Sequence, residues 1–260
     1  MLEPLQYLLG TGSGALVGFT LGLVGGGGSI LAVPLMVYLV GVPSAHVAIG
    51  TSALAVAANA ATGLVSHARA RTVKWRCGGI YAGAGLIGAL AGSTLGKAID
   101  GQKLLALFAL LMVAVGMLML RKRTGEDRPD VQCNRTNAPK VLGFGLGTGA
   151  FSGFFGIGGG FLIVPGLIAS TGMPMLNAVG TSLVAVAAFG LTTAINYAAS
   201  GLIDWPLAAV FVGGGVLGGV AGTRAARHLA GSGRLARVFA ILIFAVAGYM
   251  LWRSAPALLG

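Results

Sequence analysis

Charged side chains are scarce in this sequence, and acidic ones are the scarcest. Only 9% of the 260 residues are Asp, Glu, Lys or Arg, and Asp and Glu together number six. A water-soluble domain is typically about one quarter charged, so the composition excludes one. The hydrophobic share of 56% and the mean hydropathy of +0.89 indicate a chain that resides in a bilayer.

Residue patterns of catalytic and metal sites are missing as well. The chain has no Gly-x-x-x-x-Gly-Lys-Ser/Thr phosphate loop, no His-Glu-x-x-His and no pair of carboxylates within an apolar segment. Ser13 and Ser152 have the neighbouring glycine of an intramembrane serine protease, but nothing marks a base for either. The two cysteines, Cys77 and Cys133, lack metal-type spacing and do not establish a disulfide. We therefore expect that the protein is not an enzyme and has no metal site and no cofactor.

The charge that is present lies in the connections between long uncharged stretches. Nothing ionised at neutral pH occurs in residues 4–68, 77–96, 104–120, 141–203, 205–223 or 238–252. The short stretches are close to the ~20 residues that a helix needs to cross ~30 Å of hydrocarbon, and each long one holds about three passes. The net charge of +11 falls beside these stretches without interleaved aromatics. It is therefore interpreted as an orientation signal, and nucleic acid is not expected as a partner.

Two collinear copies of one unit make up the chain. The copies share a glycine-rich cluster leading to Val-Pro, then Gly-x-Pro, Gly-Thr-Ser and a later Trp. The matched stretches are 22–34 with 153–165, 41–43 with 172–174, 50–52 with 180–182, and 73–75 with 203–205. We therefore divide the chain into a first membrane repeat at 1–120, a polar cytoplasmic linker at 121–140 and a second membrane repeat at 141–260.

Each repeat is expected to contain about five helical segments, which makes the fold class an all-α polytopic membrane protein. The predicted segments are 4–24, 29–40, 44–66, 76–97 and 102–120 in the first repeat, and 139–155, 160–171, 175–199, 205–227 and 234–253 in the second. The second segment of each repeat is too short to cross a bilayer at right angles. We expect it to be a short broken or re-entrant segment that follows the glycine-rich cluster.

Charge differences between equivalent loops predict how the repeats are oriented. The loop at 67–75 is basic, whereas its counterpart at 198–205 carries only Asp204. By the positive-inside rule the first is cytoplasmic and the second lies outside, and the linker and the loop at 224–237 are then cytoplasmic too. This pattern favours inverted repeats with both termini outside, which place a substrate site near the bilayer midplane. Parallel repeats with four crossings each remain the alternative.

Glycines occur in two different patterns. Those at every fourth residue from Gly10 to Gly26 leave one helix face bare, which is typical of close helix packing. The clusters at 25–28 and 156–160 instead break helical order, and unwound backbone at membrane depth is tolerated only in protein or along a wet cavity. Pro34 and Pro165 are interpreted as helix-breaking residues. A short helix that runs from each cluster to its proline would present N–H donors that suit an anion. A purely structural turn is the other interpretation.

Gly-Thr-Ser occurs once per repeat and places two hydroxyl donors beside a small residue. Such donors suit an oxyanion, although Ser and Thr in membrane helices also bond back to their own backbone. The candidate substrate-binding residues are Gly26, Gly27, Gly28, Ser29, Thr51, Ser52, Gly158, Gly159, Gly160, Thr181 and Ser182. The other polar residues of the apolar segments, among them His46, Asn59 and Asn196, are given no role.

The paired glycine clusters leading to Pro34 and Pro165, each followed by Gly-Thr-Ser at Gly50 and Gly180, resemble those of the sulfite exporter TauE/SafE family of membrane permeases. The resemblance spans both repeats. It implies transport of sulfur-containing anions, such as sulfite, thiosulfate, sulfoacetate or other organosulfonates, in the bacterial inner membrane. The copies differ at Ser29 and Gly160, and at Lys74 and Asp204, so the site is not expected to be strictly symmetric.

No charged residue lies deep in the predicted membrane region, which disfavours a proton-coupled carboxylate exchanger. An inside-negative potential of 100 mV favours outward movement of one negative charge by ~2.3 kcal/mol, so we expect export by alternating access. The expected partners are a small sulfur anion and the lipid bilayer, and a homodimer is left open. The alternatives are a channel-like pore for small anions or solutes and a membrane scaffold without flux.

Overall fold

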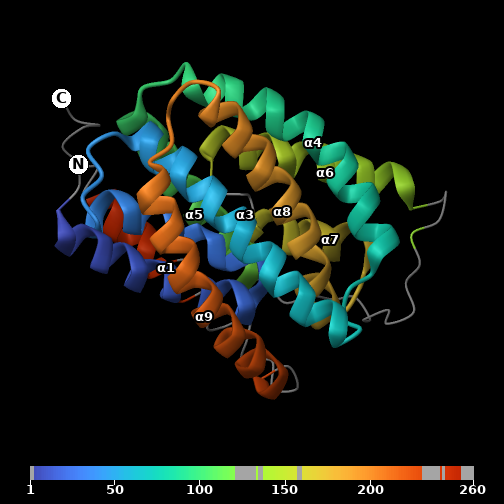
Figure 1. The fold of residues 1–260 in the computed structure, drawn as a ribbon. Coiled ribbons are helices and arrows are strands. Elements are labelled where there is room, and N and C mark those ends of the chain that lie inside the picture. The colour runs from blue at the N-terminus through green and yellow to red at the C-terminus, as the bar shows by residue number, and fades with distance from the viewer. Residues whose placement is uncertain are drawn as a thin grey trace.

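The computed structural model describes residues 3–120, 133, 137–156, 160–229, 241 and 244–252, and these contain helices and no strand (Figure 1). The elements are α1 (Pro4–Val24), the 3-10 helix η1 (Gly25–Leu31), α2 (Ala32–Pro34), the π-helix η2 (Leu35–Leu39), α3 (Ala45–Arg69), α4 (Trp75–Lys97), α5 (Gly101–Leu120), α6 (Ala138–Phe155), α7 (Gly160–Thr171), α8 (Met175–Ala198) and α9 (Trp205–Leu229). Residues 241 and 244–252 are helical as well. The prediction of an all-α fold is confirmed.

Among the residues that the structure describes, five helices are long and apolar enough to cross a bilayer, namely α1, α3, α4, α8 and most of α9. The chain is therefore a multi-pass membrane protein. The helices agree with the predicted segments to within a few residues, because proline, glycine and charged connections mark their ends. In α1, for example, Pro4 occupies the first turn, where its missing N–H costs nothing, and Gly25 ends the helix with a φ of 69°. Of the last predicted segment, only 241 and 244–252 are described.

The glycine stripes bring two pairs of helices into backbone contact, as predicted. A Cβ added at Gly18 of α1 would collide with the carbonyl oxygen of Gly215 on α9. The equivalent pair joins α6 and α4, where a Cβ at Gly149 would collide with the carbonyl oxygen of Gly85. Each first helix of a repeat thus packs against the fourth helix of the other repeat. Small residues permit this close approach. The resulting van der Waals contact stabilises the helix pairs, because the hydrophobic effect does not drive helices together within lipid.

The equivalent helices α3 and α8 cross in the middle of the molecule and run antiparallel (Figure 1). Their contacts follow in opposite order along the two helices. Gly50 at the start of α3 faces Tyr197 near the end of α8, whereas Gly63 near the end of α3 faces Leu183. In the middle, Gly190 packs against Ala53. This pair joins the two repeats in the middle of the molecule.

The segment after α1 runs back along that helix over nearly its whole length. At one end the Thr20 hydroxyl donates to the carbonyl oxygen of Gly28 at 3.3 Å, and at the other Gln6 Nε2 donates to the carbonyl oxygen of Val40 at 3.0 Å. A 3-10 helix rises ~2 Å per residue, so a short segment covers more length than an α-helix would. The segment is broken into η1, α2 and η2, which is one of the two predicted forms.

Two expectations about this segment and its counterpart need correction. Helical structure begins at Gly25, since Gly25–Leu31 forms η1, so the first cluster is not left unwound as a whole. Pro165 was predicted to break a helix, but α7 continues through it to Thr171, and the chain after Pro34 continues as η2. A proline near a helix start removes a single backbone bond, and packed neighbours in a membrane protein tolerate that loss. Residues 157–159 lie outside the described residues.

Candidate functional site

The glycine elbow of each repeat packs against the hydroxyl motif of the other repeat or the residue directly before it. Gly25 has a φ of 69°, and a Cβ there would lie 2.7 Å from the carbonyl oxygen of Val179 and 2.9 Å from Ser182 Oγ. Gly156 has a φ of 65°, and a Cβ there would collide with the side chain of Ile49. Since Ile49 and Val179 are equivalent positions, the two contacts repeat each other. The predicted elbows and motifs therefore meet where the two repeats join.

The threonines of the two motifs bond across the repeats. Thr51 Oγ1 accepts the backbone N–H of Asp204, and Thr181 Oγ1 accepts that of Lys74, both at 2.9 Å. Asp204 directly precedes α9 and Lys74 directly precedes α4, where helices have N–H groups without an intrahelical partner. Each threonine thus stabilises the start of a helix in the other repeat, a role that the sequence did not suggest.

The glycines of the same motifs make room for these contacts. A Cβ at Gly50 would collide with the carbonyl oxygen of Leu202, and one at Gly180 would lie 2.7 Å from Thr72 Oγ1. Leu202 and Thr72 are equivalent residues of the loops that precede α9 and α4. The Gly-Thr pair of each motif therefore docks the loop of the opposite repeat.

The serines differ between the repeats. Ser182 donates to the carbonyl oxygen of Val179 on its own helix at 2.8 Å, as Ser and Thr in membrane helices often do. Ser52 Oγ has no hydrogen-bond partner, although the residue is fully buried. Ser29, in η1, is fully buried too. All four motif hydroxyls are inaccessible to solvent, so the centre is sealed in this conformation.

The glycine candidates are only partly within the described residues. Gly26, Gly27 and Gly28 lie in η1, and a Cβ at Gly28 would collide with the backbone of α1 at Leu21. Gly160 is the first residue of α7. Gly158 and Gly159 lie outside the described residues. Close packing on α1 therefore accounts for the glycine at 28.

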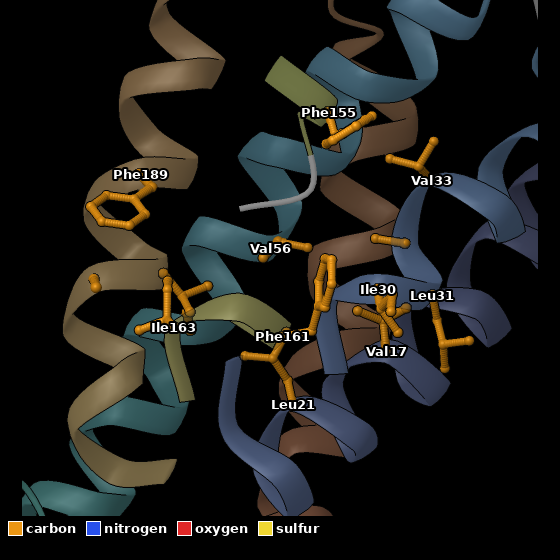
Figure 2. Packing of buried hydrophobic residues seen from close by; sticks show 14 of the residues in the cluster. Val17, Leu21, Ile30, Leu31, Val33, Val56, Phe155, Phe161, Ile163 and Phe189 are labelled. Atoms are coloured by element: carbon orange, nitrogen blue, oxygen red, sulfur yellow. The ribbon is translucent and has the colours of Figure 1, made fainter. Parts of the chain in front are cut away.

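Apolar side chains fill the space where η1 and α7 meet. Figure 2 shows Phe161 of the second repeat beside Ile30 of the first, with Val56 of α3 nearby, and all three are fully buried. Burying a bare anion among such side chains is costly. An anion therefore reaches this centre only if the elements separate.

Open grooves lie on other faces of the molecule. One groove, of about 470 Å³, is lined by one face of α6 and Leu162, and another of about 320 Å³ lies between η2 and the helix at 244–252. Their linings are almost wholly apolar, and none of the candidate substrate-binding residues lines either groove. Such surfaces suit acyl chains rather than an anion.

Lys97 is a cation that sequence reasoning missed. Its Nζ donates to the carbonyl oxygen and Oδ1 of Asn196, at 3.1 and 2.8 Å, and to Ser200 Oγ at 2.9 Å. The ammonium also lies 5.9 Å from the ring centre of Tyr197. All these partners are neutral, and no ion pair to Lys97 occurs among the residues that the structure describes. Its position at the end of an apolar helix was the available signal.

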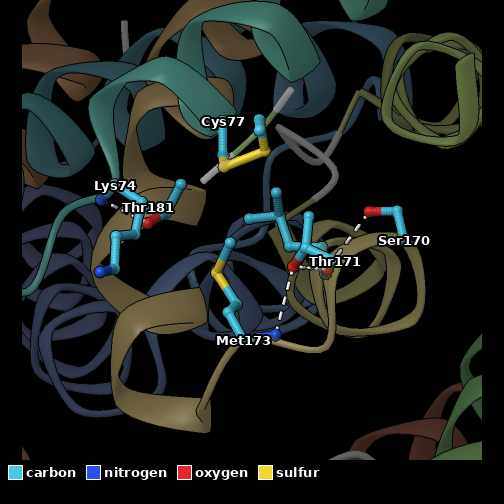
Figure 3. The surroundings of a disulfide bond; sticks show 8 residues. Lys74, Cys77, Ser170, Thr171, Met173 and Thr181 are labelled. Carbon is cyan, nitrogen blue, oxygen red and sulfur yellow. Dashed lines mark hydrogen bonds between the residues drawn. A yellow bond between two sulfur atoms is a disulfide. The ribbon is translucent and has the colours of Figure 1, made fainter. Parts of the chain in front are cut away.

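A disulfide joins Cys77 of α4 to Cys133 of the linker, with the Cα atoms 5.2 Å apart. The sequence left this pairing undecided, because 56 residues separate the two cysteines and no pattern marks them. Figure 3 shows the bond close to the Lys74–Thr181 contact and to the end of α7 at Thr171. The disulfide thus ties the linker to one of the two contacts between repeats.

Comparisons with known proteins agree with this architecture. Residues 11–250 match the family described as "Sulfite exporter TauE/SafE". The chain is 53% identical over 258 residues to a "Probable membrane transporter protein" of Xylella fastidiosa, covering 96% of this chain and 97% of that protein. It is 26% identical over 211 residues to the "Probable membrane transporter protein YdhB" of Bacillus subtilis, covering 80% and 86%. No solved structure matches the chain significantly.

Proposed function

The chain belongs to the sulfite exporter TauE/SafE family, and from this premise we propose that it carries small sulfur-containing anions across the bacterial inner membrane. Sulfite, thiosulfate, sulfoacetate and related organosulfonates are the candidate substrates. The observation that supports this most is the pairing of each glycine elbow with the hydroxyl motif of the other repeat. That pairing brings hydroxyl groups together within apolar segments that contain no charged residue.

The repeats are proposed to cross the membrane in opposite orientations. Antiparallel packing of the equivalent helices α3 and α8 supports this, because parallel repeats would place these helices in the same direction. The basic loop at 69–76 then lies in the cytoplasm and the loop at 199–204 outside. The disulfide between Cys77 and Cys133 stands against this orientation, because a reducing cytoplasm keeps cysteines as thiols. Finding them oxidised in intact cells would contradict this orientation.

Transport is proposed to proceed by alternating access. The motif serines and threonines are fully buried, so substrate entry requires that an elbow part from the motif it packs against. The bare glycine faces between α1 and α9 and between α4 and α6 offer surfaces along which one repeat shifts against the other. A sealed centre favours such a carrier over an open pore. The membrane potential favours the outward direction for an anion.

Flux into liposomes tests this proposal. Purified protein should transport sulfite with saturation and counterflow, and a panel of thiosulfate, sulfoacetate, sulfate and taurine should define the substrate class. Ser52→Ala combined with Ser182→Ala should lower the sulfite flux by about tenfold, because hydrogen bonds to a charged solute are strong. Thr192→Val is the matched control, since that hydroxyl donates to the backbone of its own helix at Ala188. Flux without saturation would favour a channel, and no flux for any anion would refute transport.

A further inference from the structure

Buried polar atoms without hydrogen-bond partners gather along α3 and α8 toward one end of the molecule. That end, called the Lys97 end here, is where α4 and α8 finish and α3 begins, since Lys97 bonds to Asn196 and Gly101 packs against Ala45. On this stretch the unpartnered atoms belong to His46, Ser52, Asn59, Thr193 and Tyr197, while Ser13 of α1 and Ser152 of α6 have unpartnered hydroxyls elsewhere. We call these five residues the polar seam. Buried polar groups are nearly always paired, so a row of unpaired ones requires an explanation.

The members of the seam lie on the facing surfaces of two helices. Ser52 and Asn59 are seven residues apart on α3, which is two turns along one face. Thr193 and Tyr197 are four residues apart on α8, on the face of Gly190, which packs against Ala53. Tyr197 also contacts Gly50, and its ring centre lies 6.4 Å from that of His46. The seam therefore runs from the Lys97 end to the middle of α3.

Asn59 forms the inner end of the seam and is its most unusual member. The residue is only 3% exposed, and neither its Nδ2 nor its Oδ1 has a partner. Its amide occupies a notch in α9, where a Cβ at Gly215 would collide with it. The equivalent notch in α4, at Gly85, is filled by the ring of Phe189, which stacks on Tyr81 with ring centres 6.5 Å apart. One repeat thus has an unpaired amide where the other has a packed aromatic.

The opposite end of the same helix pair is hydrogen-bonded. His67 Nδ1 and Thr72 Oγ1 lie 2.9 Å apart, and Asn177 Nδ2 donates to the carbonyl oxygen of Thr72 at 3.1 Å. Ser182, the counterpart of Ser52, donates to its own helix. Polar groups at this end stabilise the contact between repeats, whereas those of the seam include atoms that could form hydrogen bonds and have no partner.

We propose that the polar seam is the path along which the transported anion passes between the centre of the molecule and the Lys97 end, which rests on the transport function proposed above. The hydroxyl, amide and imidazole groups offer hydrogen bonds one after another along the seam, so an oxyanion finds a partner at each step. Lys97, paired only with neutral groups, attracts the anion at the mouth of the path. In this conformation the path is closed, because Ser52, Thr193 and Tyr197 are fully buried.

Flux through single variants tests the seam. Asn59→Leu and Tyr197→Phe should each lower the sulfite flux by about tenfold, the loss of one hydrogen bond to a charged solute, while Tm stays unchanged or rises, since no protein hydrogen bond is lost. Thr62→Val is the control for the first, because that exposed hydroxyl donates to a backbone carbonyl. Tyr81→Phe is the control for the second, because Tyr81 lies outside the seam and bonds to Thr148. Flux within about twofold of the parent protein for both seam variants would overturn the proposal.

Thiol labelling provides a readout that does not depend on transport. Thr193→Cys should react with a negatively charged thiosulfonate reagent, and sulfite should slow the reaction, whereas Ala55→Cys on α3 should stay unreactive. Both parent residues are fully buried, so only a path that opens distinguishes them. Labelling of Thr193→Cys in a protein without flux for any anion would refute the transport function, and with it the path, which rests on that function. Equal inertness of the two cysteines in an active transporter would refute the path alone.

Discussion

At the equivalent positions 59 and 189 the first repeat has an asparagine and the second a phenylalanine, although both side chains fill a notch that a glycine leaves in the facing helix. The phenylalanine stacks on Tyr81, whereas the asparagine has no partner. By contrast, the threonines at 51 and 181 make the same 2.9 Å contact in both repeats. The repeats thus share the contacts that assemble the fold and differ where a solute is proposed to pass.

The glycine stripes are the most sensitive of the shared contacts. Gly18→Leu and its counterpart Gly149→Leu should both prevent folding, because their side chains would meet backbone carbonyls and cost more than the ~1–3 kcal/mol of ordinary overpacking. Gly12→Leu and Gly143→Leu are matched controls, since no atom lies within 4 Å of a Cβ at either position. Size-exclusion profiles and Tm in detergent measure the effect. A folded Gly18→Leu protein with parental Tm would contradict close packing of α1 on α9.

Truncation to alanine should affect stability differently at the equivalent positions Asn59 and Phe189. Phe189→Ala should destabilise the protein by about 3–5 kcal/mol, because it leaves a cavity against Tyr81. Asn59→Ala should cost at most about 1 kcal/mol, because it removes no hydrogen bond. Denaturant unfolding in one detergent measures both. An equal decrease in the free energy of unfolding for both variants would mean that the two side chains have the same structural role.

Loss of the shared threonine contacts should affect both repeats alike. Thr51→Val and Thr181→Val should each cost about 1–3 kcal/mol, because each leaves the partly buried N–H of Asp204 or Lys74 without its acceptor. Thr62→Val, whose hydroxyl bonds within its own helix, should leave Tm unchanged. Thermal unfolding of the three variants makes the comparison. A large loss for only one motif threonine would show that the repeats are not joined symmetrically.

The smallest effect is expected from the lysines at the two ends of α4. Lys97→Met should lower stability by about 0.5–1.5 kcal/mol, since its three hydrogen bonds to neutral groups join α4 to α8. Lys74→Met should have no effect on Tm, because only the backbone of Lys74 takes part in the contact with Thr181. The Tm of each lysine variant, measured beside that of the parent protein, tests this difference. If Lys74→Met lowered the Tm more than Lys97→Met, the result would contradict the claim that the side chain of Lys97 joins α4 to α8.

Much of the fold followed from the sequence because its signals are local. Uncharged stretches, prolines and glycines marked the helices, and the four-residue glycine spacing predicted which faces pack. The repeat also predicted that elbows and motifs recur, although their mutual contact needed the structure. The roles of Thr51 and Thr181 were not predictable, because a hydroxyl in a sequence does not reveal a backbone partner more than a hundred residues away. Asn59 was passed over for the same reason, since only its surroundings show that its amide is unpaired.

Sulfite flux by the purified protein in liposomes tests the central claim most directly. With an inside-negative potential imposed on liposomes loaded with sulfite, the account predicts saturable efflux above that of protein-free vesicles, and counterflow when unlabelled sulfite is present outside. Efflux no faster than from protein-free vesicles, for sulfite and for every other sulfur anion tried, would contradict it.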